Sequence, residues 1–191
     1  MRLGLTALRV VVGGAFAAHG AQKLFGWFGG PGPDALGQGF EQMGIRPGKR
    51  NAVIAGASEL GGGAMIATGF LTPLGAAAIV AVMDQAVRTV HWSKGFFNSD
   101  GGYEYNVVLA ASVLAIADIG PGPVSLDRAL GTEKSGPFWA LAALAAGLAG
   151  PRLLERLAPE AAGEHEAQPE PQRFVRDRES VSAPAPAQRT A

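Results

Sequence analysis

The chain has 191 residues with 16 basic and 16 acidic side chains, so its formal net charge is zero. This balance gives no indication of a nucleic-acid partner, and the absence of cysteine excludes disulfides, thiolate nucleophiles and cysteine-ligated metal clusters. The charges are unevenly placed, because residues 155–191 hold 7 acidic and 5 basic side chains. The first 154 residues are charge-poor and rich in glycine and alanine, which is typical of closely packed membrane helices.

The first apolar segment, Leu3 to Phe25, is long enough to cross a bilayer, since a transmembrane helix needs about 20 mostly apolar residues. It contains Arg9 and Lys23, whose long side chains could snorkel toward a membrane interface. Basic residues ahead of an apolar stretch, followed by the triplet AFA at 15–17, would also fit a secretory signal. More apolar sequence follows instead of a polar mature domain, and this favours a membrane helix.

A polar loop is predicted from Gly26 to Arg50, where GGPGPD and RPGKR combine turn residues with basic ones. The apolar segment from Asn51 to His91 is too long for one span, and Pro73 between two glycines divides it. Two antiparallel spans follow, Ala52 to Phe70 and Pro73 to Trp92. A fourth span, Tyr103 to Ile119, ends at GPGP.

Ser125 followed by LDRAL predicts a capped short helix. Pro137 to Leu154 could be a fifth span or a helix at the membrane surface. We therefore predict an all-α protein with a transmembrane four-helix bundle at 1–131, a fifth transmembrane or interfacial helix at 132–154, and a disordered polar tail at 155–191. A soluble helical bundle is the alternative, but the uncharged run from Leu60 to Met83 offers water no polar face.

Ionisable residues gather toward one end of the predicted spans. If the spans alternate in direction, the ends of the first and third and the starts of the second and fourth share one membrane face, here called face B. Eight polar residues lie toward it: His19, Gln22, Lys23, Glu59, Asp84, Arg88, His91 and Glu104. The opposite half of the predicted spans holds Arg9 near its rim, and Asp118 lies where the fourth span leaves the membrane. A charge at membrane depth costs at least about 2.5 kcal/mol, so we expect these groups to turn inward and pair in a half-membrane pocket.

Helical spacing supports this expectation. His19, Gln22 and Lys23 share one helix face, and so do Asp84, Arg88 and His91. Simpler roles remain open: Asp84 and Arg88 could be a self-neutralising pair, a helix dipole favours Glu104, and Gln22, Lys23 and His91 could be interfacial anchors. Glu59 has no local partner and is the hardest to explain without a function. His19 and His91 also allow a bis-histidine haem site, although no other sequence motif indicates haem.

Several motifs resemble the DoxX-like family of small integral membrane proteins: HGAQKLFG, ELGGG, GFLTPLGA, GFFNSDGGYEYNVVL and GPGPVSLD. The resemblance covers residues 3–131 and implies a multi-pass four-helix bundle in a bacterial cytoplasmic membrane. Some members are similar to the membrane subunit of thiosulfate:quinone oxidoreductase, and others are linked to redox and thiol-stress complexes. The motifs contain His19, Gln22, Lys23, Glu59 and Glu104, and they add Asn106 to the pocket residues.

The expected function is that of an accessory subunit in a quinone-linked membrane redox system. His19, Lys23 and Glu59 could hydrogen-bond a quinone and exchange protons with it. Phe25, Trp27 and Phe28 could flank its ring, or could simply form an interfacial aromatic belt. A small-solute permease with the same pocket, or a scaffold without electron transfer, is the alternative, and whether the chain is itself an enzyme stays open.

The predicted partners are the lipid bilayer, soluble redox proteins and a second copy of the chain, with no nucleic acid, no metal and no covalently bound cofactor. Gly13, Ala17 and Ala21 form a small-residue ladder that could pack against a neighbouring helix or another copy. The positive-inside rule places face B in the cytoplasm. Face B would hold Lys23, Arg46, Lys49, Arg50 and Lys94, with Arg152 and Arg156 if the fifth span exists, against Arg2, Arg9, Arg128 and Lys134 on the other face.

Overall fold

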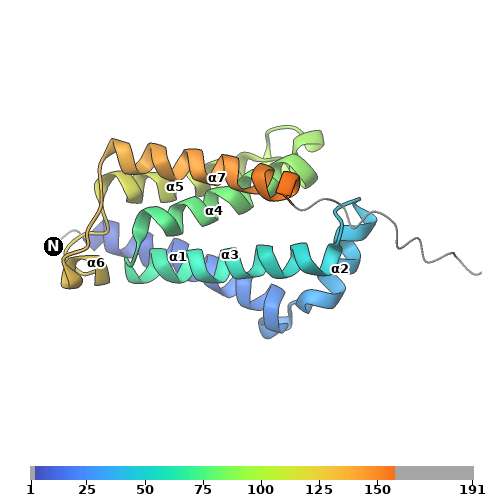
Figure 1. Ribbon diagram of the computed structural model, residues 1–191, viewed down its shortest axis with the longest axis horizontal. Helices are drawn as coiled ribbons and strands as arrows, with labels where there is room; N and C mark the ends of the chain where they lie inside the picture. Colours follow the sequence, from blue (N-terminus) through green and yellow to red (C-terminus); the bar gives the residue numbers. More distant parts are fainter. Residues whose placement is uncertain (1–2, 158–191) are drawn as a thin grey trace, which may run out of the picture. The chain divides into compact units, whose positions relative to one another are not determined.

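A computed structural model describes residues 3–157, and all the helices below belong to one compact unit, Met1–Glu160. Five long helices lie alongside one another: α1 (Leu3–Phe25), α3 (Gly48–Thr68), α4 (Thr72–Ala86), α5 (Glu104–Ile119) and α7 (Pro137–Leu157) (Figure 1). Two short helices, α2 (Gly32–Gln42) and α6 (Leu126–Leu130), lie at opposite ends of this unit. Residues 3–157 contain no strand, so the predicted all-α class is confirmed. The predicted disordered tail lies outside the described residues from position 158 onward.

Short helical turns complete the unit. A π-helical turn, η2 (Val87–His91), and a 3₁₀ turn, η3 (Trp92–Lys94), continue α4 into one rod that extends from Thr72 to Lys94. Two more 3₁₀ turns, η1 (Trp27–Gly29) and η4 (Asn98–Asp100), lie in the loops after α1 and after this rod.

One prediction about the connections was wrong, because α2 forms inside the segment expected to be a polar loop. A proline in its first turn starts the helix, and Asp34 favours the same end through the helix dipole. A Cβ at Gly37 would lie 2.7 Å from the Cα of Lys49. Glycine, which suggested a turn, instead lets α2 lie against the start of α3.

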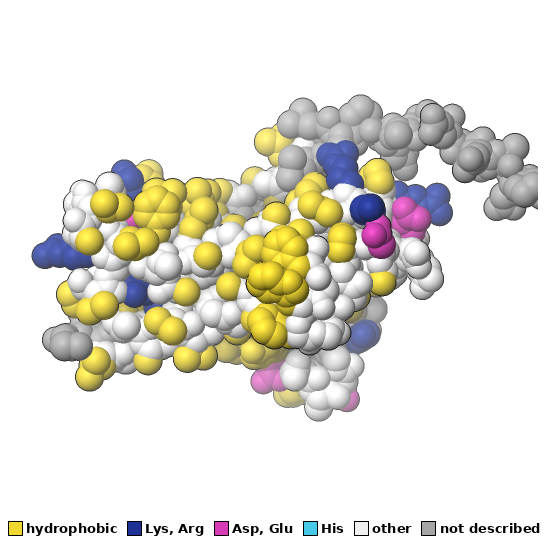
Figure 2. All heavy atoms as spheres, turned by 90° about the horizontal axis from the view of Figure 1, so that it is seen from below, with side chains coloured by type: hydrophobic (Ala, Val, Ile, Leu, Met, Phe, Trp, Pro, Cys, Tyr) yellow, Lys and Arg dark blue, Asp and Glu magenta, His cyan; other side chains and the backbone are white. Residues whose placement is uncertain are grey.

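Two rods are long and apolar enough to cross a membrane, Leu3–Phe25 and Thr72–Lys94, each with 23 residues. Only 28% and 33% of their most apolar windows are buried inside the protein, so much of their surface faces outward. Figure 2 shows hydrophobic side chains along the length of one face and charged ones mainly toward its two ends. The helix α5, with 16 residues, is shorter than a typical span. The predicted four-span arrangement therefore stays a prediction.

Glycine brings α1 and α3 into backbone contact. A Cβ at Gly13 would lie 2.4 Å from the nitrogen of Ala67, and one at Gly20 would lie 2.3 Å from the nitrogen of Leu60. From the other side, a Cβ at Gly63 would lie 2.4 Å from the nitrogen of Ala17. The small residues of the first span thus pack against α3, and Gly20 belongs to this ladder in addition to the predicted positions.

The apolar core lies among α3, α4 and α5. Its fully buried side chains include Ile66, Ile79, Val113 and Ile116. The helix α7 adds buried Ala143, and its Gly147 faces Val80 so closely that a Cβ would lie 2.6 Å from that side chain. The fifth long helix is therefore an integral part of the bundle and extends to Leu157, three residues beyond the predicted Leu154.

We expect Gly13→Ala to destabilise the protein by about 1–3 kcal/mol, because the added methyl group would collide with the α3 backbone. Gly14→Ala is the matched control, since a Cβ there meets nothing within 4 Å, and helix propensity should leave that variant as stable as the parent or slightly more so. Thermal unfolding in detergent measures both. Equal losses in the two variants would contradict the backbone contact between α1 and α3.

Candidate functional site

An ion pair joins the end of α1 to the middle of α3. Lys23 lies in the last turn of α1, and its Nζ donates to Oε1 of Glu59 on α3. The Glu59 residue is only 4% exposed, whereas the side chain of Lys23 is 26% exposed. The second carboxylate oxygen, Oε2, is buried and has no hydrogen-bond partner among the described residues. One half of the carboxylate is therefore satisfied and the other half is not.

The register of the two helices explains how this pair forms. Gly20 faces Leu60 and Gly56, so Glu59 lies about one turn further from the end of α1 than Lys23 does. A Cβ at Gly56 would lie only 3.1 Å from the Cβ of Lys23, and its absence makes room for the lysine stem. The sequence allowed Lys23 either to snorkel outward or to turn inward and pair, and its ammonium turns toward a buried carboxylate.

Polar and aromatic groups lie near Lys23 in the sequence, at the end of α1 and in the turn after it. Nδ1 of His19 lies 3.1 Å from Oε1 of Gln22, and Nε2 of Gln22 lies 3.5 Å from the carbonyl oxygen of Phe28. The rings of Phe25 and Trp27 are 5.1 Å apart, and all three aromatic side chains from Phe25 to Phe28 are more than half exposed. The end of α1 and the turn after it thus combine an imidazole, an amide and aromatic rings with the lysine that pairs with Glu59.

A second polar group joins α4 and α7. Nε of Arg88 donates to Oδ2 of Asp84 at 2.9 Å, and Nη1 of Arg152 donates to the same oxygen at 3.1 Å. Nη2 of Arg88 also donates to Gln85 at 2.6 Å. The i, i+4 pair expected from the sequence is present, and Arg152 from the fifth long helix adds a second cation to Asp84.

The remaining predicted residues hold the connection between α4 and α5. Nδ1 of His91 lies 2.6 Å from the carbonyl oxygen of Gly101, and Oε2 of Glu104 accepts from the backbone nitrogen of Asn98 at 3.0 Å. Nδ2 of Asn106, which is buried, lies 3.5 Å from Sδ of Met83. These contacts fix a loop and the start of α5, which gives each side chain a structural role.

The nine predicted residues thus lie in three local groups, at α1–α3, at α4–α7 and at α4–α5. Two hollows described on the surface lie at the other end of the unit, near α6, and none of the nine residues lines either of them. The single shared pocket stays a prediction. The Lys23–Glu59 group combines burial, charge and an unsatisfied acceptor, and it is the candidate site carried forward.

The sequence placed Arg9 near the rim opposite face B but did not predict its burial or its partners. The residue is 3% exposed, and its guanidinium donates to three carbonyl oxygens: Nε to Ala67 at 3.2 Å, and the two Nη groups to Pro121 and Val124. Arg9 therefore ties the start of α1 to the end of α3 and to the loop after α5. Its partners lie as many as 115 residues away in the chain, so no local pattern indicated them.

Asp127 is a second structural residue that the sequence analysis missed. It is 1% exposed and accepts from the backbone nitrogens of Leu71 and Thr72 at 3.0 and 3.1 Å. The hydroxyl groups of Thr72 and Thr132 donate to it at 3.0 and 3.1 Å. The α6 side chain therefore caps the start of α4. The sequence predicted only that it follows the Ser125 cap in a short helix, because its partners on α4 are more than 50 residues away.

Residues 4–92 match the family model for DoxX. The chain carries a DoxX domain. The resemblance to the DoxX-like family is thereby confirmed over these residues, and a DoxX domain indicates a family of small membrane proteins. The matched region includes Lys23, Glu59 and Asp84 but ends before α5 and α7. No curated protein and no solved structure matches the chain.

We expect Lys23→Met to destabilise this DoxX-domain protein by about 2 kcal/mol, because the variant leaves the Glu59 carboxylate buried without a cation. The double variant Lys23→Met/Glu59→Gln should recover part of the loss, since the uncompensated charge is gone. Lys49→Met is the control, because its pair with Asp34 is exposed and should contribute less than about 1 kcal/mol. Chemical unfolding in detergent compares the variants, and a fully stable Lys23→Met protein would contradict the pairing.

Proposed function

We propose that the protein is a multi-pass protein of the bacterial cytoplasmic membrane in which α1, α3, the α4–η3 rod, α5 and α7 all cross. Two observations support this proposal. The other long helices pack closely against the two apolar rods, and on the face in Figure 2 the charged side chains lie mainly toward the two ends. In this arrangement α2 and the loop before α5 lie at face B, and α6 lies at the opposite face, here called face A. The greater number of lysine and arginine residues at face B favours a cytoplasmic location for that face.

We further propose that the protein is an accessory subunit of a quinone-linked redox system. The observation that carries this proposal is Oε2 of Glu59, a buried carboxylate oxygen without a hydrogen-bond partner in the described part of the chain. A buried acceptor of this kind costs about 1–3 kcal/mol unless a further donor satisfies it. A hydroxyl group of a bound quinol is a donor of the required type.

The chemistry follows from the groups at this end of α1 and α3. A quinone takes up two electrons and two protons to become a quinol, and the electrons would come from a separate redox protein. The carboxylate of Glu59 can exchange one proton with a ring oxygen, and Lys23 stabilises the ionised carboxylate. His19 is exposed and can relay protons toward water, while Phe25, Trp27 and Phe28 offer apolar surface to a ring.

A small-solute permease remains the second candidate, because an unsatisfied buried carboxylate could equally accept a hydrogen bond from a polar solute. Uptake into vesicles that lack quinone separates the two functions. A solute flux that persists without quinone and falls in Glu59→Gln would favour transport. A scaffold role predicts neither effect.

We expect protein purified in mild detergent to retain quinone and Glu59→Gln to lose most of it, because an amide cannot carry the exchanged proton or the charge. Extraction and chromatography of the bound lipids measure the quinone content. Asp34→Asn is the matched control, since this acidic residue also pairs with a lysine but is exposed, and it should leave the quinone content unchanged. Equal quinone content in the parent and Glu59→Gln would rule out this role for Glu59.

We expect cysteines introduced by Arg46→Cys and Arg128→Cys to react with a membrane-impermeant thiol reagent from opposite sides of the membrane. Both positions are exposed, and the chain has no other cysteine that could react. Arg46 should react from the cytoplasmic side. Labelling of both variants in inside-out and right-side-out vesicles measures this, and reaction of both from one side would contradict the proposed crossing pattern.

A further inference from the structure

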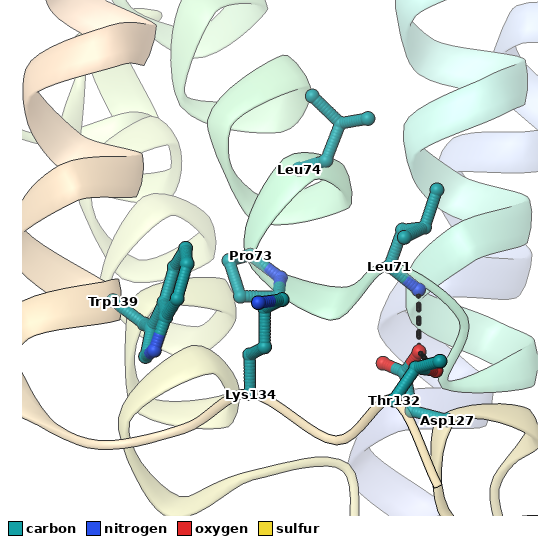
Figure 3. Close-up of a pocket in the computed structure, with 7 residues that line it drawn as sticks. All are labelled: Leu71, Pro73, Leu74, Asp127, Thr132, Lys134 and Trp139. Atoms are coloured by element: carbon teal, nitrogen blue, oxygen red, sulfur yellow. Dashed lines mark hydrogen bonds between the residues drawn. The ribbon is translucent and has the colours of Figure 1, made fainter. Parts of the chain in front are cut away.

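A hollow of about 190 Å³ lies beside the first turn of α4, at face A. Leu71, Pro73 and Leu74 from the start of α4 form its apolar side. Lys134 from the loop after α6 and Trp139 from the first turns of α7 form the opposite side (Figure 3). The hollow is smaller than the roughly 300 Å³ of a typical small-molecule pocket, so it fits a fragment of a ligand rather than a whole drug-sized molecule.

Thr132, one basic residue, Lys134, and one acidic residue, Asp127, complete the polar part of the lining. Nζ of Lys134 lies 4.5 Å from the centre of the Trp139 ring, and within residues 3–157 it forms no ion pair. The neighbouring acid, Glu133, is paired with Arg128 at 3.2 Å. Both oxygens of Asp127 already accept hydrogen bonds from α4 and from threonine hydroxyls. The ammonium of Lys134 is therefore the group in the hollow that an anion could approach.

The hollow lies at the edge of the apolar rod that begins at Thr72. Leu74 is 55% exposed and Phe138 is 72% exposed, so the side chains next to the hollow are available to acyl chains. Lysine and tryptophan at such an edge meet the region of lipid headgroups. The backbone nitrogens of Leu71 and Thr72 are occupied by Asp127, so the start of α4 is not itself free to bind a phosphate.

We propose that this hollow binds the phosphate-bearing headgroup of an anionic phospholipid. The ammonium of Lys134 contacts the phosphate, the Trp139 ring holds the lysine in place, and one acyl chain lies along Leu74. One lysine near a charged membrane surface corresponds to about a fivefold preference for an anionic over a zwitterionic lipid. The inference rests on the membrane location of the protein and not on the quinone proposal, so either can fail without the other.

The test uses the full chain in a Trp27→Phe/Trp92→Phe background, in which Trp139 is the remaining tryptophan. The protein is reconstituted in vesicles that contain brominated phosphatidylglycerol or brominated phosphatidylcholine, and quenching of Trp139 reports the lipid next to it. We expect about a fivefold preference for phosphatidylglycerol, a loss of this preference in Lys134→Ala, and its retention in Lys134→Arg. Lys94→Ala, at face B, is the matched control and should not change the preference.

The other outcomes also decide the matter. Equal quenching by the two lipids, or a preference that survives Lys134→Ala, would overturn the proposal. Inorganic phosphate at constant ionic strength separates a lipid from a free anion: if it abolishes the preference while chloride does not, the hollow binds a soluble anion instead. Circular dichroism of Lys134→Ala should match the parent, because the lysine is exposed and contacts the ring of Trp139 rather than the backbone of a helix.

Discussion

Backbone contact between α1 and α3 is the constraint on which the rest of the bundle depends. Gly13 and Gly20 on one helix, and Gly63 on the other, allow separations that a side chain at any of these positions would prevent. Helices that lie this close shield from the surroundings a side chain that turns toward the neighbouring helix. The burial of Glu59 and its pairing with Lys23 therefore follow from the same contact that holds the helices together.

The buried charges differ in how completely they are hydrogen-bonded. At the end of the bundle near α6, Arg9 and Asp127 each form hydrogen bonds with several partners. Both residues thereby join segments that are distant in the chain. A buried charge with complete hydrogen bonding contributes rigidity and resists rearrangement. Glu59 instead keeps one acceptor without a partner in the described residues. The unpartnered acceptor therefore lies between α1 and α3, away from the charged groups near α6 that have several partners each.

The sequence predicted the long helices well because their signals are local. The bounds of α1 agree with the predicted Leu3 to Phe25, and Pro73 together with two glycines marked the turn between α3 and α4. The prediction failed where glycine served packing rather than chain reversal, as in α2. The Asp84–Arg88 pair could be predicted because it lies within one helix. The partners of Arg9, Glu59 and Asp127 could not, because they depend on the rotation and register of separate helices.

The fifth long helix shows how a segment outside the matched DoxX region can become part of its structure. Asp84 lies inside the matched region, but Arg152, one of its cations, comes from α7, beyond residue 92. Gly147 and Ala143 bring α7 onto α4 closely enough for that contact to form. When a carboxylate is buried, the free-energy cost of removing it from water is offset more fully by cations on two helices than by a single cation. The helix α7 thus compensates a charge within the DoxX domain, and removing it would leave Asp84 with its remaining arginine on an exposed face of α4.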